Sequence, residues 1–362
     1  MNARRAVAAL ILTIAAVALT EPAAASPIKW LAVHLGAHQF GHLRAPDAIV
    51  ARAGADAVGF ECGKPSACPS QQPPPTGSCG CIDTLPQGPT ALDVGRDGSI
   101  WLFDGVKHRL LMWQRGRPAR PGRSVPLPSD VRDSDFVLGR DGTIYVFGGN
   151  VRGRPYLSLY ALARTGKVRW KAATTVSSSQ ARLLVGPDGS IYSVGPSATP
   201  TWTPLTTPTG RPLRLAVQRR RSSPLQPLTP TLRLLTTQVS AHEVHFALVD
   251  RGRKVVRAWR VTSRTSLGTA RLTPALVGGD LVVGLQASQR AKGTFLWENL
   301  ILRLRPTAAT GPRFALDARA VWDPDGTTAR TTLRIGSDGR LYQLRTDPAK
   351  GVTIAGYSLR GD

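Results

Sequence analysis

The sequence predicts an all-β fold, and three observations lead to this prediction. A phrase of the form Gly-x-Asp-Gly-x-[Ile/Leu]-[Trp/Tyr] occurs four times along the 362 residues. The chain holds 36 Gly and 29 Pro, which favours many turns between short strands over long helices. Apolar residues make up 42% and charged residues 19%, a composition that is typical of a folded protein and excludes an intrinsically disordered one.

Each copy of the phrase indicates a turn between two strands. Asp-Gly tolerates the positive φ angles of a two-residue type I′ turn, so we predict a tight hairpin at every copy. The four copies lie at residues 92–101, 136–145, 183–192 and 333–342. Third strands are expected at 109–113, 157–162 and 353–359, and turns into a fourth strand at 166–171 and 252–259.

The spacing of the copies predicts the number of sheets. The first three lie 44 and 47 residues apart, and 150 residues separate Gly189 from Gly339. Four short strands in such a length form one propeller blade. The long gap therefore holds two degenerate copies, which we place at 234–249 and 276–283, and a weak earlier copy fits 49–60.

We therefore predict a β-propeller of six or seven four-stranded blades. Each blade buries its faces only against its neighbours, so the ring has to close. The chain ends soon after the third strand of the last blade. We expect residues 28–33 to supply the missing outer strand.

A family resemblance follows from the repeats. The Asp-Gly hairpin with a following Ile-Tyr or Ile-Trp resembles the repeat of NHL-type propellers, to which residues 39–49 are also loosely similar. The phrase Thr-Gly-Lys-Val-Arg-Trp at 165–170 resembles instead the repeat of quinoprotein-like propellers. The resemblance covers residues 90–195 well and the rest loosely. It implies a fold but no function, because propellers host binding, hydrolytic, lyase and redox activities alike.

The N-terminus reads as an export signal over residues 1–25. Arg4 and Arg5 precede an apolar run of 14 residues, and the small residues at 23–25 suit a cleavage site. A membrane-spanning helix needs about 20 apolar residues, which this run does not reach. We expect a single monomeric propeller domain over 26–362, secreted or held in the cell envelope, with no transmembrane segment after the signal is removed.

All four cysteines lie in a Cys/Pro-rich loop at 61–90: Cys62, Cys68, Cys79 and Cys81. An exported protein meets an oxidising environment, so we predict two disulfides. Cys79 and Cys81 would be strained as a pair, which leaves Cys62–Cys79 with Cys68–Cys81, or Cys62–Cys81 with Cys68–Cys79. A zinc site is the alternative, but the C-x5-C and C-x-C spacings depart from the usual two to four residues.

The chain is strongly basic, with 47 Lys and Arg against 23 Asp and Glu and a net charge of +24. A Pro/Thr-rich insertion at 198–230 carries Arg219-Arg220-Arg221. Arginine suits bidentate contacts with phosphate or carboxylate, and a positive field attracts polyanions. The basic residues are not interleaved with aromatic ones, as nucleic-acid platforms require. The expected partner is an anionic cell-envelope polymer or another protein, and no specific nucleic acid.

Three of the six histidines, His34, His38 and His42, fall within nine residues. On a helix, histidines four residues apart share a face and suit Zn or Cu. Gly36 and Gly41 weaken such a helix, and in an extended strand residues four apart lie about 13 Å from each other. We therefore assign no metal ligands here.

Other candidate motifs are weaker still. His242 and His245 are three residues apart, whereas the H-E-x-x-H metalloprotease pattern requires four. Residues 323–326 match the start of a calcium loop but lack the later ligands, which favours a surface turn. The sequence has no G-x-S-x-G elbow, P-loop or dinucleotide fingerprint. Catalytic residues stay unassigned, and no cofactor is expected.

These observations favour a non-catalytic binding or scaffold protein of the cell envelope. The alternative is a propeller enzyme, a hydrolase or lyase, with a divalent metal in its central channel. Asparagine occurs only as Asn2, Asn150 and Asn299, so a mixed Glu/Asn cage around such a metal would be hard to build. The two hypotheses differ at the axis, where an enzyme should concentrate several acidic or histidine side chains.

Overall fold

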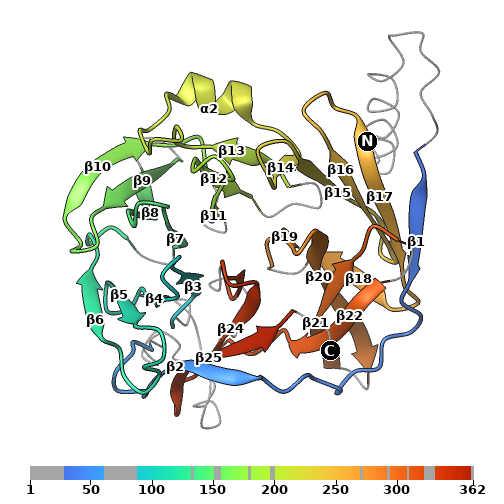
Figure 1. The fold of residues 1–362 in the computed structure, drawn as a ribbon. Coiled ribbons are helices and arrows are strands. Elements are labelled where there is room, and N and C mark those ends of the chain that lie inside the picture. The colour runs from blue at the N-terminus through green and yellow to red at the C-terminus, as the bar shows by residue number, and fades with distance from the viewer. Residues whose placement is uncertain are drawn as a thin grey trace, which may run out of the picture.

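The strands form six sheets arranged around a common axis, as the blades of a propeller (Figure 1). The predicted all-β propeller is confirmed, and the count is six in the part of the chain that is described. This computed structural model describes residues 28–60, 88–131, 134–150, 156–177, 181–195, 200–269, 272–291, 294–307, 310–321 and 331–359.

The first three blades contain the first three copies of the phrase, and neighbouring strands pair antiparallel in each. Blade one is built from β3 (Ala91–Val94), β4 (Ile100–Asp104), β5 (Arg109–Trp113) and β6 (Arg123–Pro126). Blade two is built from β7 (Phe136–Leu138), β8 (Ile144–Asn150), β9 (Leu157–Leu162) and β10 (Val168–Ala173). Blade three is built from β11 (Arg182–Val185), β12 (Ile191–Val194) and β13 (Trp202–Pro204).

The last three blades follow the same plan with longer strands. Blade four is built from β14 (Leu225–Pro227), β15 (Arg233–Ser240), β16 (Glu243–Val249) and β17 (Val255–Thr262). Blade five is built from β18 (Ser266–Thr269), β19 (Ala275–Val277), β20 (Asp280–Ala291), β21 (Thr294–Leu304) and β22 (Thr310–Asp317). Blade six is built from β23 (Leu333–Ile335), β24 (Arg340–Asp347) and β25 (Gly351–Ser358), joined by an N-terminal strand.

The sequence placed most of these strands correctly. The two degenerate copies predicted at 234–249 and 276–283 are the β15–β16 and β19–β20 pairs. The segment 198–230 contributes β13 and β14 to blades three and four, and between them lies the helix α2 (Leu215–Arg221).

The turn of the repeated phrase differs from the prediction. In the first copy Gly95 N–H donates to the Ser99 carbonyl at 2.8 Å, and Gly98 N–H donates to the Gly95 carbonyl at 2.9 Å. Gly98 has φ +77°, whereas Asp97 is not among the described residues with positive φ. The prediction of a two-residue type I′ turn is therefore wrong, because the hairpin has a three-residue loop that ends on a left-handed glycine.

The aspartate of the phrase has a second function in this loop. In the first three copies its carboxylate accepts hydrogen bonds from the backbone N–H and the hydroxyl of the residue two positions later. The distances are 3.0 and 2.5 Å for Asp97 with Ser99, 3.0 and 2.6 Å for Asp141 with Thr143, and 3.0 and 2.9 Å for Asp188 with Ser190. The recurrence of Asp is thus explained by its side-chain hydrogen bonds within the loop, and that of Gly by its positive φ angle.

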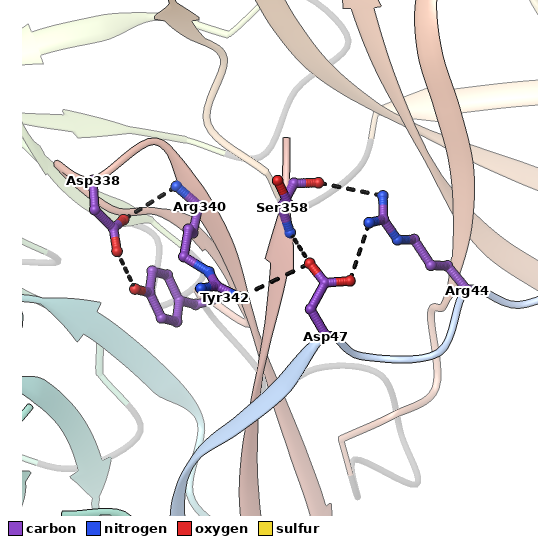
Figure 2. Close-up of polar contacts among 6 residues, drawn as sticks. All are labelled: Arg44, Asp47, Asp338, Arg340, Tyr342 and Ser358. Atoms are coloured by element: carbon purple, nitrogen blue, oxygen red, sulfur yellow. Dashed lines mark hydrogen bonds and ion pairs between the residues drawn. The ribbon is translucent and has the colours of Figure 1, made fainter. Parts of the chain in front are cut away.

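The ring closes through β2 (Ala48–Ala53), which pairs antiparallel with β25 as the outer strand of blade six. The expectation that residues 28–33 fill this place is wrong, since β1 (Trp30–His34) pairs parallel with β17 in blade four. The weak copy at 49–60 is likewise not a seventh blade, because its only strand is β2. Directly before β2, Asp47 and Arg44 form hydrogen bonds with the backbone of Ser358 in blade six, which hold β2 in this place (Figure 2).

The core lies between the blades. The buried cluster between blades one and six includes Leu102 and Trp113 from one side and Leu344 and Ile354 from the other. Similar clusters lie between blades one and two, two and three, four and five, and five and six. Burial of one such large apolar side chain stabilises the fold by about 1.5–3 kcal/mol. The rigidity of any site on this ring therefore rests on contacts between blades.

Candidate functional site

Two carboxylates, one on and one directly before an innermost strand, join neighbouring blades. Asp93 on β3 accepts the N–H of Leu138 on β7 at 2.7 Å. Asp135, directly before β7, accepts the N–H of Leu183 on β11 at 2.6 Å. Both acids therefore satisfy backbone donors of the next blade, which a buried N–H requires.

Blade six supplies the positive charge near these acids. Arg334 on β23 places Nε 2.8 Å from Asp93 Oδ1, and the Thr331 hydroxyl donates to Asp135 Oδ2 at 2.9 Å. Burial raises the pKa of Asp135, although Arg334 and the bonds from Leu183 and Thr331 oppose the rise. The buried atoms Asp135 Oδ1 and Arg334 Nη2 have no hydrogen-bond partner among the described residues.

The three clustered histidines do not converge. His34 on β1 is exposed, and its Nδ1 lies 2.8 Å from Thr262 Oγ1. His38 Nε2 lies 2.7 Å from Glu298 Oε2 on β21, and His42 is exposed. Within the described ranges no group of three or more His, Cys, Asp or Glu side chains could hold a metal ion.

Glu298 is a residue that sequence reasoning missed. Its second oxygen accepts the Gly41 N–H at 2.7 Å, so one carboxylate holds both ends of the segment 38–41. A cavity of about 400 Å³ lies between this segment and blade five, lined by His38 and His42 and by Arg313 and Phe314. No local signal links residues 260 positions apart in the chain.

The other two histidines of interest lie on or beside β16. His242 is exposed, and His245 Nε2 lies 2.6 Å from Glu243 Oε1. Arg260 Nε lies 2.8 Å from the same oxygen, and the Trp30 ring is 4.5 Å from the His245 ring. Burial by itself raises the pKa of Glu243, but the bonds from Arg260 and His245 lower it overall. This network fastens β1 to blade four.

Several predicted features fall outside the described residues. They are the signal at 1–25, the four cysteines Cys62, Cys68, Cys79 and Cys81, and the Asp-Gly turn at 323–326. Asn299 is buried on β21, and the side chain of Asn150 is not described. Among the described helices, none has the length and apolar character needed to cross a bilayer.

The helix α2 lies on the outer rim, over blade three (Figure 1). Its one buried residue is Gln218, which is 1% exposed. The Gln218 amide donates to the carbonyls of Leu213 at 2.8 Å and Ala173 at 3.3 Å, and its oxygen accepts the Thr175 N–H at 2.9 Å. Since Ala173 ends β10, one side chain anchors α2 to blade two.

Five exposed arginines surround this anchor, and we call them the arginine surface: Arg211, Arg214, Arg219, Arg220 and Arg221. The last three lie in the final turn of α2, where positive charge interacts favourably with the helix dipole. Arg219 donates to the Tyr156 hydroxyl at 3.4 Å. In the part of the chain that is described, none of the five forms an ion pair with a carboxylate.

A second basic site lies on blade one. Lys107, Arg109 and Arg123 line an open cavity of about 390 Å³. Asp104, which is buried, lies 3.1 Å from Arg109 and neutralises it. The uncompensated charge here is smaller than on the arginine surface.

Several solved structures resemble this chain at low sequence identity. No family model and no curated protein matches the chain. Virginiamycin B lyase from Staphylococcus aureus is 8% identical with a TM-score of 0.37, over 75% of this chain and 95% of that one. A PQQ-bound aldose sugar dehydrogenase from Streptomyces coelicolor is 12% identical with a TM-score of 0.40, over 74% and 93%. The Pan2 WD40 domain from Neurospora crassa is 10% identical with a TM-score of 0.36, over 76% and 90%.

Proposed function

We propose that this protein is an exported, non-catalytic β-propeller of the cell envelope that binds anionic polymers at the arginine surface. One observation carries the proposal: five exposed arginines over residues 211–221 lie on a segment that the buried Gln218 anchors to blade two. The net charge of +24 adds a long-range field of the same sign.

The chemistry of arginine supports this partner class. Its planar guanidinium binds carboxylate or phosphate through two parallel hydrogen bonds. Because α2 is already held in place, an anionic chain would bind without paying to order the helix. Contacts between exposed charges are screened by salt, so the affinity should fall as ionic strength rises.

The enzyme alternative receives less support from the axis. The carboxylates of Asp93 and Asp135 each accept a backbone N–H from the next blade, and Arg334 lies beside them. A neighbouring guanidinium repels a divalent cation. The described acids of the inner strands therefore suit a structural function between blades.

The experiment that tests the proposal measures the binding of fluorescent polyglutamate and of long-chain polyphosphate at several salt concentrations. Replacing Arg219, Arg220 and Arg221 by Gln should weaken binding about tenfold or more, since each lost contact with an anion removes up to about 1 kcal/mol. The matched control replaces Arg115, Arg117 and Arg120, which are exposed on blade one, by Gln. It therefore removes the same number of positive charges. Equal losses in both variants, or binding that ignores salt, would contradict the proposal.

The export part of the proposal has its own measurement. Cleavage after residue 25 yields a mature chain that begins at Ser26. The mass of the protein recovered from the culture medium or the envelope fraction should correspond to that start. Recovery of the uncleaved chain in the cytoplasm would contradict it.

A further inference from the structure

The hairpin of β20 and β21 extends beyond its own blade. β18 pairs with β20 only as far as Ser288, and β22 pairs with β21 only as far as Glu298. Past these points the two strands pair only with each other, with Gln289 opposite Leu296 and Arg290 opposite Phe295. At about 3.3 Å per residue, three such residues project roughly 10 Å from the blade.

The projecting part carries large apolar side chains that the protein leaves partly exposed. Phe295, Leu296 and Trp297 are 49%, 38% and 40% exposed. Successive residues of a strand point to opposite faces, so Leu296 lies on one face while Phe295 and Trp297 lie on the other. A site that binds a flat ligand needs apolar side chains on one face only. This hairpin has them on both faces.

Arginines flank the aromatic face. The Arg290 guanidinium lies 5.9 Å from the centroid of the Phe295 ring, and the Arg319 guanidinium lies 4.7 Å from that of Trp297. Arg319 also donates to the Phe295 carbonyl at 2.7 Å. The two rings stack with centroids 6.0 Å apart. Aromatic rings beside arginines are the combination found where proteins meet the interface of a bilayer.

We propose that Phe295, Leu296 and Trp297, on the projecting part of β21, insert into the interface of an anionic lipid bilayer. The projection of roughly 10 Å matches the 5–10 Å to which interfacial segments are buried. The acyl region covers both apolar faces at once, and the anionic headgroups pair with Arg290 and Arg319. The proposed partner is thus an acidic phospholipid surface, to which the hairpin binds reversibly.

This inference does not rest on the arginine surface. α2 lies at blade three, whereas the hairpin belongs to blade five. If the arginine surface did not bind polymers, the hairpin proposal would be unaffected. If the hairpin did not bind lipid, the polymer proposal would be unaffected.

Co-sedimentation with vesicles of phosphatidylglycerol and phosphatidylcholine tests the proposal. Replacing Phe295, Leu296 and Trp297 by Ser should weaken vesicle binding about tenfold or more, because the inserted apolar area is lost. The matched control replaces Val168, Val239 and Val256, three exposed apolar residues elsewhere, by Ser. Arg290→Gln should weaken binding about fivefold on anionic vesicles and leave the weak binding to pure phosphatidylcholine unchanged.

Insertion itself is read from tryptophan fluorescence quenched by brominated acyl chains. Trp297→Phe should remove most of the quenching while binding persists. Trp30→Phe, at the other tryptophan that is exposed among the described residues, should retain it. Three outcomes would overturn the proposal: no quenching of Trp297, equal loss of vesicle binding in both triple variants, or a dimer in sedimentation that only the hairpin variant dissociates. If the hairpin variant lost polyglutamate binding to the same extent as vesicle binding, the hairpin would be a surface for soluble polymers, and the lipid proposal would be wrong.

Discussion

The carboxylate of Asp47 accepts a hydrogen bond from the backbone N–H of Ser358, 311 residues later in the chain. Arg44 joins the same pair, because it lies 3.1 Å from Asp47 and donates to the Ser358 carbonyl at 3.2 Å (Figure 2). Arg340 of β24 approaches the carboxylate to 3.8 Å. These contacts fix the start of β2 against the end of β25, which is where the ring closes.

Replacing Asp47 by Ala should therefore destabilise the closed ring. We expect the free energy of unfolding in urea to fall by about 1–2 kcal/mol, since the Ser358 N–H loses its acceptor. Asp56→Ala is the control, because that exposed carboxylate lies in the same N-terminal segment. A loss of the same size in both variants would mean that Asp47 has no special function in closure.

Acid should weaken the hairpin turns of the repeats. Burial alone raises the pKa of Asp97 and Asp141, but the bonds from Ser99 and Thr143 and the nearby arginines lower it overall. A folded-state pKa below the unfolded value gives stability that is present at neutral pH and lost as pH falls below about 4. The double variant Asp97→Asn and Asp141→Asn should show a flatter dependence of the unfolding free energy on pH. An unchanged slope between pH 5 and about 2 would contradict this.

The sequence predicts local features well and long-range pairings poorly. The repeated phrase fixes both the hairpins and their spacing, because a left-handed glycine and alternating apolar residues leave a signal within ten positions. The sequence predicts 28–33 instead of β2 as the outer strand of blade six, since both segments are short and apolar. The contact of Asp47 with Ser358 accompanies the pairing of β2 with β25, and no local pattern encodes it.

The same limit applies to the site. The three consecutive arginines of 219–221 are visible in the sequence, but the anchor Gln218 is a single polar residue whose partners lie in another blade. Asp135 likewise looks ordinary before the fold brings Thr331 to it, 196 residues away. Burial and pairing across blades give these residues their functions.

The joint between blades two, three and six depends on Asp135. Asp135→Ala should cost about 2–4 kcal/mol in urea unfolding, because the Leu183 N–H and the Thr331 hydroxyl both lose their acceptor. Asp135→Asn retains an acceptor oxygen and should cost less.

A pH series separates the charge of Asp135 from its hydrogen bonds. Since burial raises its pKa, the native state binds this proton at a pH where the unfolded chain has released it. The stability from this group is therefore present below the unfolded pKa of about 3.9 and declines as pH rises. As pH rises, the free energy of unfolding of Asp135→Asn should increase relative to that of the unmodified protein. A difference between the two proteins that stays constant with pH would contradict this.

Gln218→Ala tests whether polymer binding needs a fixed helix or only positive charge. The change removes no charge, but it deprives α2 of its bonds to Ala173, Thr175 and Leu213. If the arginine surface binds as an ordered set, the lost anchor should weaken polyglutamate binding about threefold to tenfold through the cost of ordering the helix again. The salt dependence should stay, because all five arginines remain. Hydrogen exchange over 215–221 should report faster opening in the variant, while blade one exchanges as before. Unchanged affinity together with faster exchange would show that diffuse charge, and not the placement of α2, attracts the polymer.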